Sequence, residues 1–348
     1  AGNGLKLYEN PESYNADEIA ARFNLRSKHS LEKLAAGNAD CFTTVSSITA
    51  EECRLFLKRS VDVITPNGFD DAFVGSPDEL KEKRKTAKAK LAEVATALLN
   101  IDISEDSYFV INSGRYEYRN KGIDMFIDSL AELNSDKKNK KKVIAFITVP
   151  GDQSGSLKDL KGRFGQPVNG NGISGEYLTH GLHSPASDQI LNHLKAHRFN
   201  ESENNNVHVI FVPSYLNGND GIFNMEYYDL LAGFDLSVFP SYYEPWGYTP
   251  LESIAFGIPT ITTNLAGFGR WMNEHDKGTE DGVTVIPRDD ENYHVAVQEV
   301  KSMILNYLSI SKKEAANRTE SAIKLAAELK WENLINHYEE AYSYAIAQ

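Results

Sequence analysis

From residue 104 onward, short runs of β-branched and aliphatic residues alternate with helical segments, and this alternation restricts the fold more than any other feature of the sequence. Strands separated by helices indicate βαβ units, which build a parallel sheet with helices on both faces. We therefore predict an α/β protein with a doubly wound parallel sheet. The expected strands cover residues 108–112, 143–149, 207–212, 236–240 and 258–262.

The first 103 residues contain fewer strand signals. Only residues 41–45 and 61–65 have a strand pattern, and a capping box at Thr49–Glu52 predicts a helix from there to about residue 58. A complete Rossmann domain needs well over about 100 residues, because each βα unit takes roughly 30. We therefore expect residues 1–103 to be part of a domain, and the start at Ala1 without Met suggests a chain that begins inside a larger protein.

The charge balance and the cysteine count exclude several classes of protein. The chain has 36 basic and 49 acidic residues, a net charge of −13, so its mean field repels nucleic acid and we expect no nucleic-acid partner. No apolar run reaches the roughly 18 residues of a membrane span, and we expect no membrane partner. Cys41 and Cys53 are too few for a disulfide framework, which favours two reduced thiols in a cytoplasmic protein.

Several common motifs are missing or badly placed. The sequence has no Gly-Lys dipeptide of a P-loop, no G-x-S-x-G and no D-x-D. A G-x-G-x-x-G at residues 170–175 has no strand before it, so we interpret it as a flexible loop. His193 and His197 have a spacing that can bind zinc, yet no carboxylate or cysteine completes an obvious set. We expect a surface-facing pair and no metal site.

Residues 113–122 (SGRYEYRNKG) follow an expected strand and precede a helix, where doubly wound sheets bind ligands. Gly114 allows the backbone to turn sharply. Arg115 offers a fork of donors for phosphate oxygens and Lys121 a compact charge, so the two can embrace a diphosphate. On residue types alone, two solvated surface charges remain the preferred interpretation.

Residues 239–252 (FPSYYEPWGYTPLE) also follow a strand and precede a helix. Thr249, Pro250 and Glu252 fit positions N-cap, N1 and N3 of a capping box. The start of such a helix directs free N–H groups into the preceding loop, which makes a natural anion site.

Glu244 lies just outside that helix start, eight residues before Glu252. A carboxylate beside bound phosphate would be repelled, so Glu244 is better suited to accept hydrogen bonds from sugar hydroxyls. For Glu252, a capping role and ribose binding are equally good interpretations. Flat faces for a sugar or a base are expected from Tyr242, Tyr243 and Trp246.

Glu244 and Glu252 form the E-x7-E pattern of retaining glycosyltransferases with two facing Rossmann domains, the GT-B fold. Residues 238–269 resemble, more specifically, the eukaryotic-type glycogen synthase family, glycosyltransferase family 3. Residues 113–122 resemble that family's G-R-Y-E-x-x-N-K-G. The resemblance extends from about residue 30 to the C-terminus and is weak at 151–206. Shorter matches lie at 40–46, 63–68, 317–320 and 331–334.

The resemblance implies transfer of glucose from UDP-glucose to the 4-hydroxyl of a non-reducing α-1,4-glucan end, with retention of configuration. Arg115 and Lys121 would neutralise the departing diphosphate without a metal or another cofactor. Glu244 would contact the donor glucose, and we do not assign it as a nucleophile. The expected substrate-binding residues are Gly114, Tyr243, Trp246, Gly247, Tyr248, Thr249 and Glu252, of which Glu252 binds ribose and the amides of 247–249 share the diphosphate.

The resemblance also divides the chain. Residues 1–103 correspond to the last part of the acceptor-side Rossmann domain, residues 104–300 to the complete nucleotide-sugar domain, and residues 301–348 to helices that return toward the N-terminal domain. The family's arginine-rich helix, which receives glucose 6-phosphate, is replaced by residues 311–316 with few basic side chains, so strong activation is not expected. Homo-oligomerisation stays open.

Two alternatives stay open as well. A relative could use another sugar nucleotide, such as ADP-glucose, in the same site. The chain could also be a donor-binding fragment without activity of its own, because the family's N-terminal glycine-rich loop, histidine and further arginine have no match in residues 1–40.

Overall fold

The computed structural model describes residues 10–348, and its main feature is a six-stranded, all-parallel sheet in the order β10-β9-β8-β3-β4-β7. This confirms the predicted α/β class and parallel sheet. The strands are β3 (Tyr108–Ser113), β4 (Val143–Thr148), β7 (Val207–Val212), β8 (Leu236–Val238), β9 (Thr260–Thr263) and β10 (Val283–Ile286).

The sheet grows outward from its centre in two directions. The chain starts at β3, adds β4 and β7 on one side, and then crosses to add β8, β9 and β10 on the other. The strand order therefore reverses between β3 and β8. In open parallel sheets, ligands bind outside the carboxyl ends of the strands at such a reversal, so the topology alone places a candidate site there.

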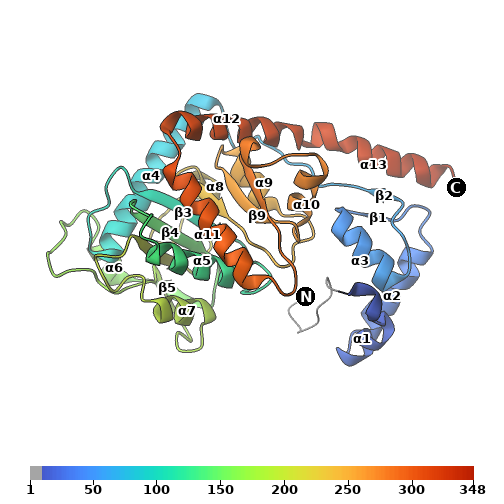
Figure 1. The fold of residues 1–348 in the computed structure, drawn as a ribbon, viewed down its shortest axis with the longest axis horizontal. Coiled ribbons are helices and arrows are strands. Elements are labelled where there is room, and N and C mark those ends of the chain that lie inside the picture. The colour runs from blue at the N-terminus through green and yellow to red at the C-terminus, as the bar shows by residue number, and fades with distance from the viewer. Residues whose placement is uncertain (1–9) are drawn as a thin grey trace.

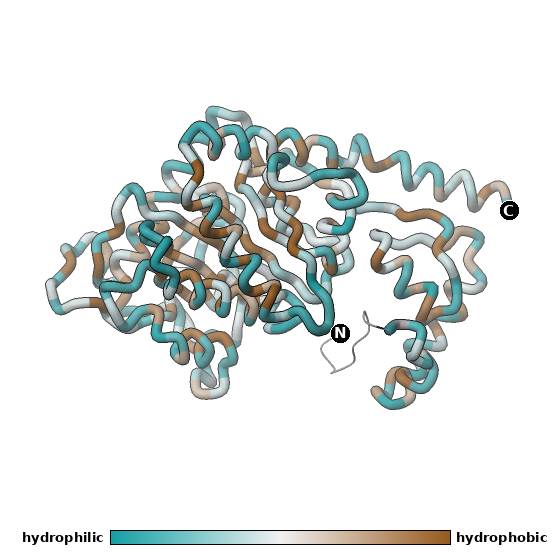
Figure 2. The backbone as a smooth tube through the Cα atoms, viewed as in Figure 1, coloured by the Kyte–Doolittle hydropathy of each residue, from teal (hydrophilic) through white to brown (hydrophobic). Residues whose placement is uncertain are grey.

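Helices cover both faces of the sheet, because successive strand side chains point to opposite sides. Phe109 and Phe146 face one hydrophobic core, and Val110 and Ala145 face the other. Figure 2 shows hydrophobic residues concentrated along the strands, while the outer helices alternate between hydrophilic and hydrophobic residues. The first core includes α4 (Pro77–Leu99), α8 (Tyr227–Leu231), α9 (Tyr248–Ala255) and α12 (Lys312–Glu328), and the second includes α5 (Ile123–Ser135), α7 (Gln189–His197) and α11 (Tyr293–Ser309).

Helix α4 begins and ends at strong local signals. Ser76 and Glu79 form a capping box around Pro77, and Asn100 ends the helix in the left-handed conformation. Its buried side chains lie in the first of these two cores, on one face of the six-stranded sheet, although the expected boundary places residues 1–103 in the other domain. We therefore propose that the nucleotide-sugar domain begins before α4; the first nine residues of the expected domain lie outside the described residues.

Ahead of α4, the part of the chain that the structure describes contains three α-helices and a two-stranded parallel sheet. Helix α3 has Ser46 as its N-cap with Thr49 at N3, so the expected Thr49–Glu52 capping box is wrong. Ser46 Oγ accepts a hydrogen bond from the Thr49 N–H, and the Ser46 N–H donates to Thr49 Oγ1. The helix therefore begins three residues earlier than expected. These elements are α1 (Ala16–Arg22), α2 (Arg26–Gly37), β1 (Thr43–Thr44), α3 (Ser47–Leu57) and β2 (Val63–Ile64).

The C-terminal helix α13 (Trp331–Ile346) connects the region of the six-stranded sheet with the region of β1 and β2. Figure 1 shows it running from the end of α12 above the six-stranded sheet to the opposite end of the molecule, where β1 and β2 lie. The Tyr338 hydroxyl donates to the backbone oxygen of Thr65 and to Asn67 Oδ1 at 3.4 and 3.3 Å. The remaining elements of the described residues are the pair β5 (Gln153–Ser156) and β6 (His180–Leu182), the helices α6 (Lys158–Gly162) and α10 (Gly267–Glu274), and the short 3-10 helices η1 (Pro11–Ser13) and η2 (Thr279–Asp281).

Candidate active site at the centre of the sheet

The two segments selected from the sequence meet at the reversal of strand order. Residues 114–122 follow β3 and residues 239–247 follow β8, and these strands are neighbours. The N–H groups of Tyr242 and Tyr243 donate to the backbone oxygen of Asn120 at 2.9 and 3.1 Å. The backbones of the two loops are thus bonded to each other.

Gly122 permits this close approach. Its φ of +65° is unfavourable for other residues, and a Cβ at this position would overlap the Pro240 carbonyl oxygen. Gly122 also ends the loop as the N-cap of α5. One glycine therefore serves both the turn into the helix and the contact between the loops.

Lys121 and Glu244 form an ion pair at the meeting point of the loops. Lys121 Nζ donates to Glu244 Oε2, and each side chain is 16% exposed. The two residues are 123 positions apart in the sequence, and the structure brings together these two of the three predicted catalytic groups, without Arg115. Since both charges are largely removed from water, each depends on the other for stabilisation.

Arg115 lies on the same loop in a different environment. Its side chain is 77% exposed and pairs with Glu117 at 3.0 Å. Gly114, with a φ of +140°, makes the turn between β3 and Arg115. An exposed guanidinium on this turn is free to reorient toward an anion, because a surface ion pair contributes little energy.

Glu252 is a second, partly buried carboxylate of the site. The Tyr228 hydroxyl donates to Glu252 Oε1 at 2.8 Å. Burial raises the pKa of Glu252, and the bond from Tyr228 opposes that rise. The neighbouring Tyr227 shares a 2.8 Å hydrogen bond with Ser113 at the end of β3. Sequence reasoning missed both tyrosines; adjacent tyrosines in an expected helix just before β8 were the available signal.

The start of α9 differs from the sequence prediction. The helix begins at Tyr248 after Gly247, whose φ is +114°, so Thr249 is inside the first turn and is not the N-cap. Glu252 is accordingly the fifth helical residue, and its carboxylate bonds to Tyr228. A glycine that takes the left-handed conformation can begin the helix without a side-chain cap. The first-turn amides of Tyr248 and Thr249 still adjoin the loop that carries Glu244.

The aromatic residues of this loop have unequal exposure. Trp246 is 3% exposed and packs edge-on against Phe268, so the expectation that its ring offers a free face to a ligand is wrong. Tyr243 is partly buried, and its hydroxyl bonds to Glu52 of α3 at 3.4 Å. Tyr248 is 44% exposed at the helix start. The Trp246 ring packs between the loop and α10. The local sequence does not distinguish an aromatic ring that packs in this way from one that contacts a ligand.

The N-terminal region also touches the site. The Ser46 hydroxyl donates to the backbone oxygen of Pro245 at 2.7 Å, directly after Glu244. A Cβ at Gly267 would overlap both that carbonyl oxygen and the Ser46 side chain. The start of α3 therefore closes one side of the loop that carries Glu244.

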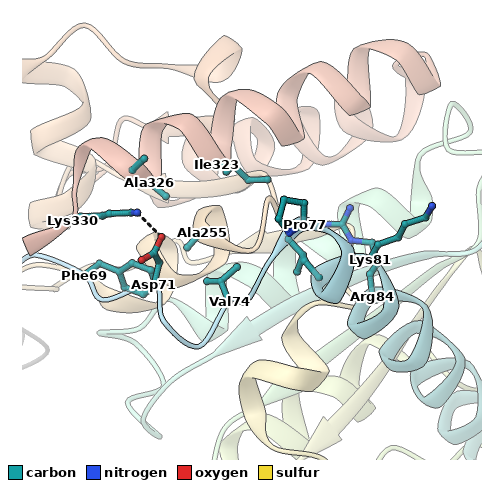
Figure 3. Close-up of a pocket in the computed structure, with 13 residues that line it drawn as sticks. Phe69, Asp71, Val74, Pro77, Lys81, Arg84, Ala255, Ile323, Ala326 and Lys330 are labelled. Atoms are coloured by element: carbon teal, nitrogen blue, oxygen red, sulfur yellow. Dashed lines mark ion pairs between the residues drawn. The ribbon is translucent and has the colours of Figure 1, made fainter.

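A well-formed cavity of about 390 Å³ lies elsewhere. Figure 3 shows its residues on α4, α12 and the segment before α4, with an ion pair between Lys330 and Asp71 at 2.6 Å. Ala255, at the C-terminal end of α9, lines it, whereas the two loops meet at the N-terminal end of that helix. Its lining differs from the expected donor-site residues.

His193 and His197 have a carboxylate partner after all. Asp128 Oδ1 lies 2.9 Å from His193 Nε2 and 3.1 Å from His197 Nε2. The expectation that no carboxylate completes this pair is therefore wrong. Asp128 is on α5, 65 residues before His193, so only the packing of α5 against α7 shows the contact.

A family model described as glycogen synthase matches residues 1–164 and 175–348. The chain belongs to the glycogen synthase family. The match includes both loops of the site and the helices α11 to α13.

Curated glycogen synthases are similar to the chain over nearly its whole length. It is 30% identical to glycogen (starch) synthase isoform 2 of Saccharomyces cerevisiae, covering 99% of this chain and 58% of that protein. It is 31% identical to the glycogen (starch) synthase of Caenorhabditis elegans, covering 95% and 58%. The chain thus spans just over half of the length of these glycogen synthases.

Solved structures show the same fold. The sucrose-phosphate synthase of Thermosynechococcus elongatus aligns with a TM-score of 0.53 at 17% identity, over 92% of this chain and 62% of that one. The catalytic domain of starch synthase IV from Arabidopsis thaliana, bound to ADP and acarbose, aligns at 0.53 and 16%, over 91% and 58%. These similarities support an α/β fold of the GT-B type for this member of the glycogen synthase family. Within residues 10–348, no helix is both long and apolar enough to cross a membrane.

Proposed function

We propose that the protein is a retaining glucosyltransferase that transfers glucose from UDP-glucose to the 4-hydroxyl of a non-reducing α-1,4-glucan end. The observation that carries the proposal is the Lys121–Glu244 ion pair at the reversal of strand order. It joins the two chemical groups that such a site needs, a cation for phosphate and a carboxylate for sugar hydroxyls. Membership of the glycogen synthase family supports this assignment.

In this proposal, the diphosphate of the donor binds at the loop after β3. Lys121 transfers its interaction from Glu244 to the phosphate, and the exposed Arg115 turns from Glu117 toward the same group. The amides of Gly247, Tyr248 and Thr249 add partial positive charge at the start of α9. These groups stabilise the negative charge that develops on the leaving UDP.

In this proposal, the glucose and the ribose of the donor bind on opposite sides of Lys121. Glu244, released from Lys121, accepts hydrogen bonds from the glucose hydroxyls and stabilises positive charge at the reacting carbon. Glu252, which Tyr228 holds in place, binds the ribose. Gly114 leaves room for the phosphates, and Tyr243 and Tyr248 would flank the bound donor. The thiols of Cys41 and Cys53 are free, in keeping with a protein of the cytoplasm.

A matched pair of lysine variants tests the donor site. Lys121 and Lys301 form ion pairs of nearly equal exposure, but Lys301 pairs with Asp136 away from the loops. We expect Lys121→Met to weaken UDP-glucose binding about 10- to 150-fold, since a hydrogen bond to a charged group contributes about 1.5–3 kcal/mol. Lys301→Met should leave it unchanged. Equal affinities for the two variants in isothermal titration calorimetry would refute the assignment, and ADP-glucose titrated in parallel identifies the preferred nucleotide.

The second candidate is a donor-binding unit without turnover, favoured by the coverage of 58% of the relatives' length. Incubating the 348-residue chain with radiolabelled UDP-glucose and glycogen decides between the two. Incorporation of label eliminates the binding unit. Donor binding without incorporation supports it, and Glu244→Gln should then be assayed in the intact enzyme, where we expect turnover to be lost while UDP-glucose still binds.

A further inference from the structure

Three ligand-type atoms converge on the surface formed by α5 and α7. Asp128 Oδ1, His193 Nε2 and His197 Nε2 form a triangle with edges of 2.9, 3.1 and 3.2 Å. Asp128 and His193 are partly buried, and His197 is exposed. The spacing of His193 and His197 places both imidazoles on one side of α7, one turn apart.

Two tyrosine hydroxyls form hydrogen bonds with the atoms of His193 and Asp128 that face away from the triangle. The Tyr118 hydroxyl is 2.7 Å from His193 Nδ1, which leaves Nε2 to face the triangle. The Tyr293 hydroxyl, at the start of α11, donates to Asp128 Oδ2 at 2.7 Å, which leaves Oδ1 to face it. Hydrogen bonds of this kind, which fix the orientation of ligands from outside, are typical of metal sites.

The geometry suits a cation better than it suits hydrogen bonding alone. Both Nε2 atoms are directed at the same carboxylate oxygen while only 3.2 Å apart, so two N–H groups would crowd each other there. A cation about 2 Å from each of three such atoms fits above the triangle, as zinc does with imidazole and carboxylate ligands. Ca²⁺ and Mg²⁺ prefer all-oxygen sets, so this set favours a transition metal.

We propose that Asp128, His193 and His197 bind one Zn²⁺-class ion, with the fourth position open to solvent. The site lies outside the donor site and does not depend on the proposed transfer reaction. It would tie α7 to α5 and, through Tyr118, to the loop that carries Arg115 and Lys121.

Protons compete with the metal at this site. Burial acts against it, yet hydrogen bonds from His193, His197 and Tyr293 hold the pKa of Asp128 well below its usual range, so the carboxylate stays ionised. A proton and a metal ion exclude each other on an imidazole nitrogen, because the ring must be neutral to act as a ligand. The other charged groups that act on this cluster are Asp124, Arg119 and Arg288.

The test uses the full chain without an affinity tag. We expect elemental analysis after dialysis against Zn²⁺ to find about one Zn²⁺ per chain, and Co²⁺ to give the strong visible absorption of a four-coordinate site. His193→Gln and His197→Gln should each weaken Zn²⁺ binding at least about 100-fold, and Tyr293→Phe about 10- to 100-fold. His183→Gln, on an exposed histidine outside the cluster, should bind as the parent does.

Circular dichroism of each metal-free variant establishes that it is folded. Zn²⁺ binding that is equal in His193→Gln and His183→Gln would overturn the proposal. Should a histidine variant fail to fold, the parent protein decides: a titration without saturable Co²⁺ absorption, or absorption that does not diminish when Zn²⁺ is added, overturns it equally.

Discussion

At the scale of single residues, Gly122 sets the distance between the loops that carry Lys121 and Glu244. Its positive φ and the nearby Pro240 carbonyl oxygen are separate constraints. The first is a cost of backbone conformation, and the second is a direct steric conflict. The two effects can be separated, because Gly165 also has a positive φ but has no neighbouring atom that a Cβ would overlap.

We predict that Gly122→Ala lowers the free energy of unfolding by more than about 1 kcal/mol and weakens UDP-glucose binding, because the loops must separate to admit the Cβ. Gly165→Ala is the matched control: Gly165 has a φ of +70°, and a Cβ there would meet nothing within 4 Å. Chemical denaturation and calorimetry measure both effects. An equal loss of stability in the two variants would show that the contact with Pro240 is unimportant.

Single residues also show how much of the candidate site could be predicted from the sequence. Lys121 and Glu244 were identifiable because they follow strands in a pattern that resembles a known family, and the structure joins them. Tyr228 and Asp128 were not, because each acts through a partner that only the packing of helices reveals. Trp246 was misjudged for a related reason, since an aromatic residue in a loop gives no sign of which side is covered.

At the scale of elements, α8 and α9 cooperate to present Glu252. Helix α8 supplies the Tyr228 hydroxyl, and α9 supplies the carboxylate. Because burial raises the pKa of Glu252, it becomes protonated at a higher pH than an exposed glutamate does. A protonated carboxyl is a poorer acceptor for ribose hydroxyls, so donor affinity should fall as pH drops through this pKa.

We predict that Tyr228→Phe weakens UDP-glucose binding about 2- to 10-fold at pH 7 and shifts the acidic loss of affinity to higher pH. The lost hydroxyl no longer opposes the burial-induced rise in the pKa of Glu252. A hydrogen bond to a charged group contributes about 1.5–3 kcal/mol, and we expect only the part that orients the carboxylate to be lost from donor binding. Titrations across a pH series measure both. Tyr108→Phe, at the opposite end of β3, should leave the profile unchanged; an unshifted profile in Tyr228→Phe would contradict the role of Glu252.

Most elements were predictable because they carry their own local signals. The strands β3, β4 and β7 are mostly apolar, and α4 has a proline at its first position behind a serine cap. The starts of α3 and α9 were not predictable to the residue, because several serines, threonines and glycines compete for each cap position. Tertiary contacts choose among them: Ser46 also bonds to Pro245, and Gly247 lies against Glu244.

At the scale of the whole molecule, α13 is the long connection between the six-stranded sheet and the N-terminal region (Figure 1). The backbone of Phe69 bonds to Leu329 and Trp331, and the Trp331 ring lies so close to Gly68 that a Cβ there would overlap it. The ring also packs edge-on against Tyr338, with centroids 5.6 Å apart.

We predict that Trp331→Ala increases amide hydrogen exchange roughly tenfold in residues 43–69 and leaves β3 and β4 unaffected, because the aromatic contact lies at the junction only. Mass-spectrometric exchange of the whole chain resolves the two regions. Tyr342→Ala, on the same helix but 63% exposed, should cause no change. Faster exchange spread over the six-stranded sheet would instead mean that the molecule unfolds as one unit.

The mutual neutralisation of Lys121 and Glu244 has a consequence for which molecules the proposed site admits. A simple anion such as inorganic phosphate would have to draw Lys121 away and leave the largely buried Glu244 carboxylate without a partner, so its net gain is small. A free sugar would have to draw Glu244 away and leave the Lys121 ammonium group without a partner. A nucleotide sugar brings phosphate and hydroxyls in one molecule, and both charges keep a partner. We therefore expect the Lys121–Glu244 ion pair to favour binding of an intact nucleotide sugar over binding of either of its hydrolysis products alone.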